Sequence, residues 1–401
     1  MWAAQPERLK RDKRSILRIF DAPDNALEED YPQQYDDEPQ WPEFNDELWQ
    51  HEWYLKDTRS LPGLPKLDLN VLPVYERGIT GRGIRVAVLD DGVEYTHEDL
   101  AENYDPEISW DCNHDTPDAR PNFQDHVNSH GTRCAGEIAM VANNRKCGVG
   151  IAFGAKVGGI KLLGGHVYDL IEGMALGFAH DKSNFTKEAP NITWRDVQHI
   201  IVNTAEYIPL QANKGWTENA AGLLYNIRFG FGLMNADAFV TAASTWMNVP
   251  PKSTEIILPK DFAAPRNLST SIGTISVTFD NATGRIRYLE HVEVQVDLGY
   301  TERGVLEIFL TSPRGTKVQL LTKRNRDKSK EGFRPWIFMS VATWSEDPRG
   351  MWEVQILDTS PLGIFNSGSL NDCKLILHGT EEIPPHLKDG PRVYNMNYVR
   401  R

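Results

Sequence analysis

The sequence predicts two structural parts, an α/β part with a parallel sheet followed by an all-β sandwich. Before about residue 248, short apolar runs alternate with segments whose apolar residues recur at helical spacing. From about residue 250 onward, short runs alternate apolar and polar residues, and turn signals such as those at 312–315 and 348–350 separate them. A chain of 401 residues is long enough for both parts.

The α/β part is expected to open with a buried strand at 84–89, an almost continuous apolar run. We expect the first helix to begin at His130 with Ser129 as its N-cap, because a serine hydroxyl accepts free backbone N–H groups of a first turn. The apolar face of this helix is expected to consist of Cys134, Ile138 and Val141.

A strand at 155–163 and a helix at 168–180 repeat this order, which favours a parallel sheet. A further helix is expected at 194–205, where Thr193 and Asp196 have the spacing of a capping box, and another ends near residue 246. The apolar faces are expected to be Leu170, Ile171, Met174 and Phe178 on the helix at 168–180, and Val197, Ile200, Ile201 and Thr204 on the helix at 194–205.

Bulk properties limit the function classes. The formal net charge of −13 argues against nucleic acid as a partner, and no run of 18 apolar residues encodes a membrane span. The N-terminus lacks the apolar stretch of a signal peptide, and the four cysteines allow three pairings. Four glycosylation triplets nevertheless favour a secreted glycoprotein, and they begin at Asn184, Asn191, Asn267 and Asn281.

Two residues carry candidate chemistry. Asp90 ends the first expected strand and His130 opens the first helix, and in parallel α/β folds reactive groups gather where strands end and helices begin. An aspartate there can orient an imidazole and stabilise its charged form, as in a serine hydrolase triad. Either residue alone has a structural explanation, as a turn Asp or a helix-entry His. The pair, in this order, favours a catalytic role for both.

The sequence around both residues resembles the subtilisin/kexin-like proprotein convertases, the kexin subfamily of peptidase family S8. Val-Leu-Asp-Asp-Gly-Val-Glu at 88–94 is similar to the family's Asp motif, and His-Gly-Thr-Arg-Cys-Ala-Gly-Glu at 130–137 to its His motif. The β-rich remainder resembles the family's P (Homo B) domain. Within the family, these motifs resemble those of the type 7 branch most. The resemblance to the family extends over about residues 8–380.

This resemblance implies a subtilisin-like α/β fold, incomplete here, followed by a jelly-roll-like sandwich. The implied boundaries are a propeptide remnant at 1–14, an N-terminal arm at 15–80, a truncated peptidase domain at 81–248, a P domain at 249–380 and a tail at 381–401. The implied activity is calcium-dependent cleavage of precursor proteins after paired basic residues in the secretory pathway or Golgi. The propeptide would be cut after Arg14.

The resemblance also assigns binding residues. The family's calcium ligands fall on Asp46, Asp99 and Asn144, with backbone carbonyls near 141, 146 and 148, and oxygen donors suit calcium. Asp91 matches an acid that contacts a basic substrate residue, whereas a second such acid is replaced by Val127. By the same resemblance, Cys147 matches a half-cystine whose partner is missing, and Cys134 a free cysteine near the catalytic histidine.

The largest departure from the family lies near 182–187, where a convertase would carry roughly half of its catalytic domain. No Gly-Thr-Ser-x-Ala-x-Pro occurs anywhere, so the nucleophilic serine is missing, and so is the oxyanion asparagine. In subtilisin, loss of the serine alone lowers turnover by about 10⁶. We therefore expect an inactive chain. It is either an incomplete gene model or splice form, or a catalytically dead binding or regulatory protein that uses the P domain.

Overall fold

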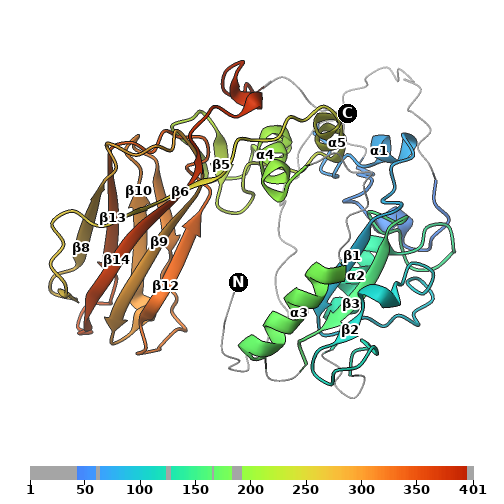
Figure 1. Cartoon of the computed structure of the whole chain (residues 1–401), viewed down its shortest axis with the longest axis horizontal. Coiled ribbons are helices and arrows are strands. Elements are labelled where there is room, and N and C mark those ends of the chain that lie inside the picture. Colours follow the sequence, from blue (N-terminus) through green and yellow to red (C-terminus); the bar gives the residue numbers. More distant parts are fainter. Residues whose placement is uncertain (1–42, 60–63, 123–127, 165–166, 183–191, 395–401) are drawn as a thin grey trace, which may run out of the picture. The chain divides into compact units, whose positions relative to one another are not determined.

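The computed structural model describes residues 43–59, 64–122, 128–164, 167–182 and 192–394 (Figure 1). Its first part contains a parallel sheet of order β1-β3-β2, as predicted, in which Arg85 lies opposite Lys156. The strands are β1 (Arg85–Asp90), β2 (Trp110–Asp111) and β3 (Lys156–Lys161), and the helices are α1 (Leu72–Glu76), α2 (His130–Ala139) and α3 (Asp169–Lys182).

The buried residues of this part form several small clusters. One contains Phe44, Trp49 and Leu55 of the N-terminal arm with Val149, and another lies between β1, β3 and α2. Helix α3 differs from its predicted face. Phe178 stacks on Trp110, and Ala175 is buried, but Leu170 and Met174 are 74% and 41% exposed. Two of the four residues of the predicted apolar face of α3 are therefore exposed, Leu170 mostly and Met174 in part.

The middle of the chain contains α4 (Trp194–Thr204), the short strands β4 (Trp216–Glu218) and β5 (Leu224–Asn226), and α5 (Ala236–Ser244). The predicted capping box of α4 is confirmed, since the Thr193 side chain and the Asp196 carboxylate each accept a backbone N–H of the other residue. The predicted buried face is wrong at Ile201, which is exposed, and the helix instead buries Arg195, Asp196 and His199.

The last part is a sandwich of two antiparallel sheets, as predicted. One sheet has the order β11-β10-β13-β8, and the other has the order β12-β9-β14-β6 with β7 also paired to β14. The strands are β6 (Ser253–Ile257), β7 (Arg266–Ser269), β8 (Thr274–Asp280), β9 (Tyr288–Tyr300), β10 (Leu306–Thr311), β11 (Lys317–Leu321), β12 (Phe333–Ser340), β13 (Met351–Asp358) and β14 (Ser367–Thr380).

The alternating residues of these strands meet in one continuous core. Every second side chain of β9, from Val292 to Leu298, is fully buried, and Trp352 of β13 is also buried completely. Isolated 3₁₀ turns occur at Trp49–His51, Pro106–Ile108, Ile208–Leu210, Arg303–Val305 and Pro385–Leu387. Within the described ranges, no helix combines the length and the apolar character needed to cross a membrane.

Candidate active site

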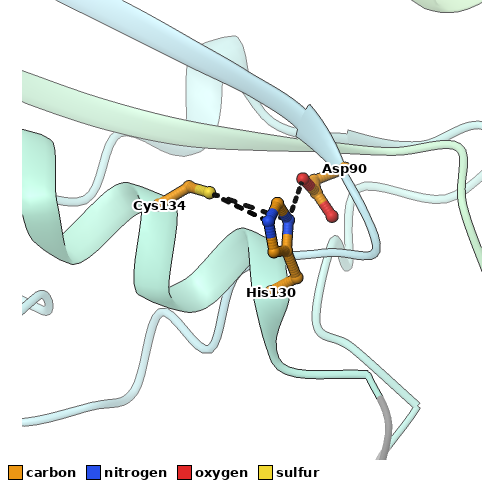
Figure 2. A group of neighbouring side chains, drawn as sticks. All are labelled: Asp90, His130 and Cys134. Atoms are coloured by element: carbon orange, nitrogen blue, oxygen red, sulfur yellow. Dashed lines mark hydrogen bonds and ion pairs between the residues drawn. The ribbon is translucent and has the colours of Figure 1, made fainter. Parts of the chain in front are cut away.

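Asp90 and His130 meet where the last residue of β1 faces the first residue of α2. The Nδ1 atom of His130 lies 2.7 Å from Oδ2 of Asp90 (Figure 2). The Asp90 side chain is 13% exposed, whereas the imidazole is 56% exposed. A buried carboxylate on one ring nitrogen fixes the orientation of the ring and leaves Nε2 available for proton transfer. The two predicted catalytic residues are therefore brought together in the geometry of a triad's Asp–His pair.

The glycine that follows His130 makes this close approach possible. A Cβ atom on Gly131 would lie 2.4 Å from the carbonyl oxygen of Gly92 and 2.9 Å from Cβ of Asp90. Contacts that short do not occur between real side chains and backbone, so any other residue would push the start of α2 away from β1. The His-Gly pair of the motif thus has a packing explanation as well as a chemical one.

Asp91 caps helix α2 from a distance. Its Oδ2 accepts the backbone N–H of His130 at 3.0 Å, and its Oδ1 accepts that of Gly131 at 2.8 Å. The predicted cap is wrong, because the Ser129 side chain accepts no backbone N–H of the helix. Asp91 is also only 6% exposed, and its expected contact with a basic substrate residue stays a prediction. A negative charge here stabilises the helix N-terminus.

Cys134, one turn along α2, completes a group of three side chains. Its Sγ lies 3.7 Å from Nδ1 and 3.8 Å from Nε2 of His130, so that the imidazole lies between the thiol and the carboxylate (Figure 2). Burial and the charge of Asp90 raise the pKa of this thiol, which keeps it protonated and a poor nucleophile. The three donor atoms lie within 4.8 Å of one another, and their types match those that bind zinc.

The contacts of His130 differ from those of a complete triad in the place of the nucleophile. Among the described residues, no serine or threonine oxygen is hydrogen-bonded to His130. The serines Ser367 and Ser369 belong to β14 of the sandwich. Residues 183–191, and with them the junction near 182–187, lie outside the described residues, as does Val127.

The predicted calcium ligands also converge. Oδ1 of Asp99 accepts a hydrogen bond from Nδ2 of Asn144 at 2.7 Å. Oδ1 of Asp46 accepts a hydrogen bond from the backbone N–H of Asn144 at 3.3 Å. Oδ2 of Asp99 is fully buried and has no hydrogen-bond partner among the residues that the structure describes. Burial, with the charge of Asp46 adding to it, raises the pKa of Asp99. An unpartnered buried carboxylate oxygen beside a second carboxylate is an arrangement that a bound cation would stabilise.

The loop around these ligands has a tightly wound backbone. Asn143, Arg145 and Cys147 all have positive φ, at 63°, 61° and 30°, although none is a glycine. Left-handed backbone at three such positions costs free energy and persists where a function or surrounding contacts hold it. The carboxylates of Asp46 and Asp99 therefore suit a hard, oxygen-binding cation. Asn144 directs its Nδ2 at Asp99 and its Oδ1 at Lys146 N, so it would have to turn its amide to join Asp46 and Asp99 in holding that cation.

Sequence reasoning missed a buried acid beside this loop. Both carboxylate oxygens of Glu52 accept the backbone N–H of Val149 at 3.0 Å. Burial raises the pKa of Glu52 to about 7, with Glu137 and Asp46 adding to the rise. A single Glu in a polar arm gives no sequence signal of burial, so only the fold identifies it as a group that titrates near neutral pH.

A second missed group joins α4 to the sandwich. Glu290 is 1% exposed. Its carboxylate forms hydrogen bonds with Nε of Arg195 and Nε2 of His199, each at 3.0 Å. The available signal was an acid among apolar residues at the start of β9. This network explains why Arg195 and His199 of α4 are buried, because their side chains hydrogen-bond to an acid of the strand rather than enter an apolar core.

The remaining predicted sites divide by position. Arg14, Asn184 and Asn191 lie outside the described residues. Asn267 is exposed, but Asn281 is 5% exposed and its Nδ2 donates to Pro348 O at 3.2 Å, so the folded sandwich does not present it for glycosylation. All four cysteines, Cys147 included, are free thiols.

Two family models match the chain. The subtilase family model matches residues 81–185, and the proprotein convertase P-domain model matches residues 289–377. In the solved structures, a serine protease of Aeromonas sobria matches with a TM-score of 0.69 and 17% identity, over 84% of this chain and 96% of that one. This likeness confirms the fold, a subtilisin-like part followed by a β-sandwich.

Curated relatives agree with the family models. Furin of Rattus norvegicus is 31% identical over 471 positions, covering 84% of this chain and 58% of furin. Proprotein convertase subtilisin/kexin type 5 of Homo sapiens is 30% identical over 498 positions, which cover 89% of this chain and 27% of that protein. Furin-like protease 2 of Drosophila melanogaster is 30% identical over 491 positions, which cover 86% of this chain and 29% of that protein.

Two facts follow from these alignments. The chain spans between 27% and 58% of the length of these three relatives. Each alignment is also longer than the 401 residues of the chain, so the relatives carry sequence that has no counterpart here. With matching family models, relatives and fold, the chain belongs to the subtilisin/kexin-like proprotein convertase family.

Proposed function

We propose that this chain is a proprotein convertase family member that keeps the Asp90–His130 pair but does not catalyse peptide hydrolysis. The observation that carries the proposal is the 2.7 Å contact between Asp90 and His130 without a serine partner among the described residues. Without the nucleophile and the oxyanion asparagine, neither the acyl-enzyme nor its oxyanion can form efficiently. The pair remains because β1 and α2 position it without help from other parts of a catalytic domain.

The comparisons support an internal deletion as the cause. The subtilase match ends at residue 185, inside the predicted junction at 182–187. Alignments of 471 to 498 positions need relatives' residues that this chain of 401 does not supply. We place the truncated peptidase domain at 81–248 and the P domain at 249–380, and the resemblance to the type 7 branch stays a prediction.

A longer form with the segment restored would have the activity implied by the family. That form would cut precursor proteins after paired basic residues in the secretory pathway, with Asp46, Asp99 and Asn144 holding calcium. Its propeptide would be removed after Arg14, and Asn184, Asn191 and Asn267 would be candidate glycan acceptors. When bound, calcium would supply positive charge that stabilises the fold around the buried carboxylates.

The test of inactivity uses the full chain and a fluorophosphonate probe, which labels activated serines covalently. We expect no labelling and no cleavage of a peptide with paired basic residues, whereas rat furin, treated in parallel, is labelled and cleaves it. A probe adduct mapped to any serine of this chain would overturn the proposal. Long-read sequencing of cDNA across codons 182–187 separates a splice form from an incomplete gene model.

The completeness of the sandwich favours a second candidate, a catalytically dead binding or regulatory protein. Its core is continuous and its two sheets are closed over it. Such a protein should change the rate at which an active convertase cleaves its precursor when the purified full chain is added in excess. An unchanged rate, with no complex in size-exclusion chromatography, would remove this candidate.

A further inference from the structure

One end of the sandwich carries a short exposed apolar segment, residues 361–365, here called the apolar tip. Leu362 is fully exposed, Phe365 is 89% exposed and Ile364 is 46% exposed. The backbone N–H of Ile364 donates to Pro361 O at 3.1 Å, and Gly363 has a φ of 83°, so the tip is a closed turn of the type that needs glycine at its third position. This turn holds large apolar side chains in solvent without any partner among the described residues.

A neighbouring turn extends the apolar surface. Ile272, between β7 and β8, is 53% exposed. The N–H of Asp358 donates to Gly273 O at 2.8 Å, and Thr270 N donates to Asn366 O at 3.0 Å. These bonds place the turn at 270–273 against both ends of the segment that carries the tip. Scattered exposed apolar residues are normal, but a group on adjoining turns indicates a binding surface.

A positively charged loop flanks this surface. The connection between β11 and β12, residues 322–332, contains five Lys or Arg and two Asp or Glu, and is called the basic loop. Nζ of Lys323 donates to Thr359 O at 2.8 Å, and Arg303 N donates to Ser329 O at 3.0 Å. Thr301 N, two residues before Arg303, donates to Ser367 O at 3.0 Å. The basic loop and the apolar tip therefore lie at the same end of the sandwich.

Two cations of the basic loop are available to a ligand. Asp327 is paired with Arg303 and Arg324, and Lys328 is paired with Glu302. Arg326 and Lys330 are exposed and form no ion pair within the described ranges. The chain as a whole carries −13, but salt screens charges beyond about 8–10 Å, so the local positive charge governs what this end attracts.

We propose that this end of the sandwich docks on an anionic lipid surface. Leu362 and Phe365 would enter the interface between headgroups and acyl chains, and Arg326 and Lys330 would contact the anionic headgroups. Apolar side chains that protrude from a rigid turn, beside unpaired cations, have the chemistry that peripheral proteins use at membranes. The proposal is independent of catalysis, because it uses only the sandwich.

The test measures partitioning of the full chain onto vesicles by flotation. Vesicles consist of phosphatidylcholine alone or mixed with phosphatidylserine. We expect binding to the mixed vesicles that weakens with salt. We expect at least a tenfold weaker partition constant for Leu362→Ser/Phe365→Ser, and about a tenfold weaker one for Arg326→Gln/Lys330→Gln. The matched control is Ile337→Ser/Met339→Ser, which removes two apolar side chains of β12 that are 51% and 59% exposed.

Several results would overturn the proposal. They are no binding to mixed vesicles, equal binding to both vesicle types, and loss of binding in the control as large as in the tip variant. Binding that depends on Arg326 and Lys330 but not on the apolar tip would identify a site for soluble polyanions instead of lipid. We expect every variant to fold, because all six side chains are substantially exposed. Far-ultraviolet circular dichroism checks this.

Discussion

The α/β part and the sandwich bury their apolar residues to different degrees. The sandwich closes two sheets over one continuous core, whereas the α/β part has a three-stranded sheet, several small clusters and a helix with exposed Leu170 and Met174. A complete fold supplies its own cover for each apolar face. The difference teaches that the elements of the sandwich cover one another's apolar faces, whereas some apolar side chains of the α/β part stay exposed among the described residues, as the proposed internal deletion would leave them.

The largest effect should come from the sandwich core. Trp352→Ala removes a fully buried indole whose Nε1 donates to Pro348 O at 2.9 Å, and we expect it to lower the free energy of unfolding by about 3–5 kcal/mol. Leu170→Ser on α3 should change it by less than about 0.5 kcal/mol, because that side chain is already in solvent. Urea titration of the full chain measures both. Equal costs would contradict the contrast.

Acid should weaken the junction between α4 and the sandwich. Burial disfavours ionisation of Glu290, but hydrogen bonds from His199 and Arg195 outweigh it and lower the pKa from 4.5 to about 2. This contribution, about 3 kcal/mol, is fully present above pH 4.5 and is lost as the pH falls towards 2. The urea midpoint should drop across that window, and Glu290→Gln should flatten the drop. A wild-type slope in the variant would argue against Glu290.

The α/β part should respond to calcium. At calcium concentrations about 10- to 100-fold above the Kd, its free energy of unfolding should rise by about 1–3 kcal/mol. Asp99→Asn should abolish this gain. In chelator the variant should be at least as stable as the wild type, because the raised pKa of Asp99 marks a charge that burial destabilises. Asp118→Asn, a change at an acid paired with Arg120, is the control that should keep the response.

The smallest effect compares two helix starts. Thr193 accepts a backbone N–H of α4 with its hydroxyl, so Thr193→Ala should cost about 1 kcal/mol. Ser129 makes no such bond at the start of α2, so Ser129→Ala should cost less than about 0.5 kcal/mol. Thermal unfolding of the two variants side by side measures the difference, and a larger loss for Ser129→Ala would reverse the assignment of the caps.

The fold was predictable where local pattern and burial coincide. The alternation of apolar and polar residues that the sequence shows after residue 250 is confirmed in β9 and β13, where the alternating apolar residues enter the core. The prediction failed on α4, where period alone placed Ile201 inside. The burial of Arg195 and His199 depends on Glu290, almost a hundred residues away, and no local window of sequence contains that partner.

The site was predictable in part for the same reason. Asp90 and His130 end and begin elements whose edges converge in any parallel α/β sheet, so their meeting follows from topology. The cap of α2 could not be assigned in this way. Ser129 is the nearest residue with suitable chemistry, but Asp91 reaches the same N–H groups from the end of β1, because Gly131 lets the helix approach.

The long strand β9 runs from the end of the sandwich that contacts α4 to the end that carries the apolar tip and the basic loop. It begins at Tyr288, beside Glu290 and the α4 network, and ends at Tyr300, beside the turns that carry the apolar tip and the basic loop. Thirteen residues at about 3.3 Å each span about 40 Å. A sandwich anchored by its loop end would act as a rigid spacer. It would hold the α4 junction one domain-height above the surface, within reach of chains that are tethered to the same membrane.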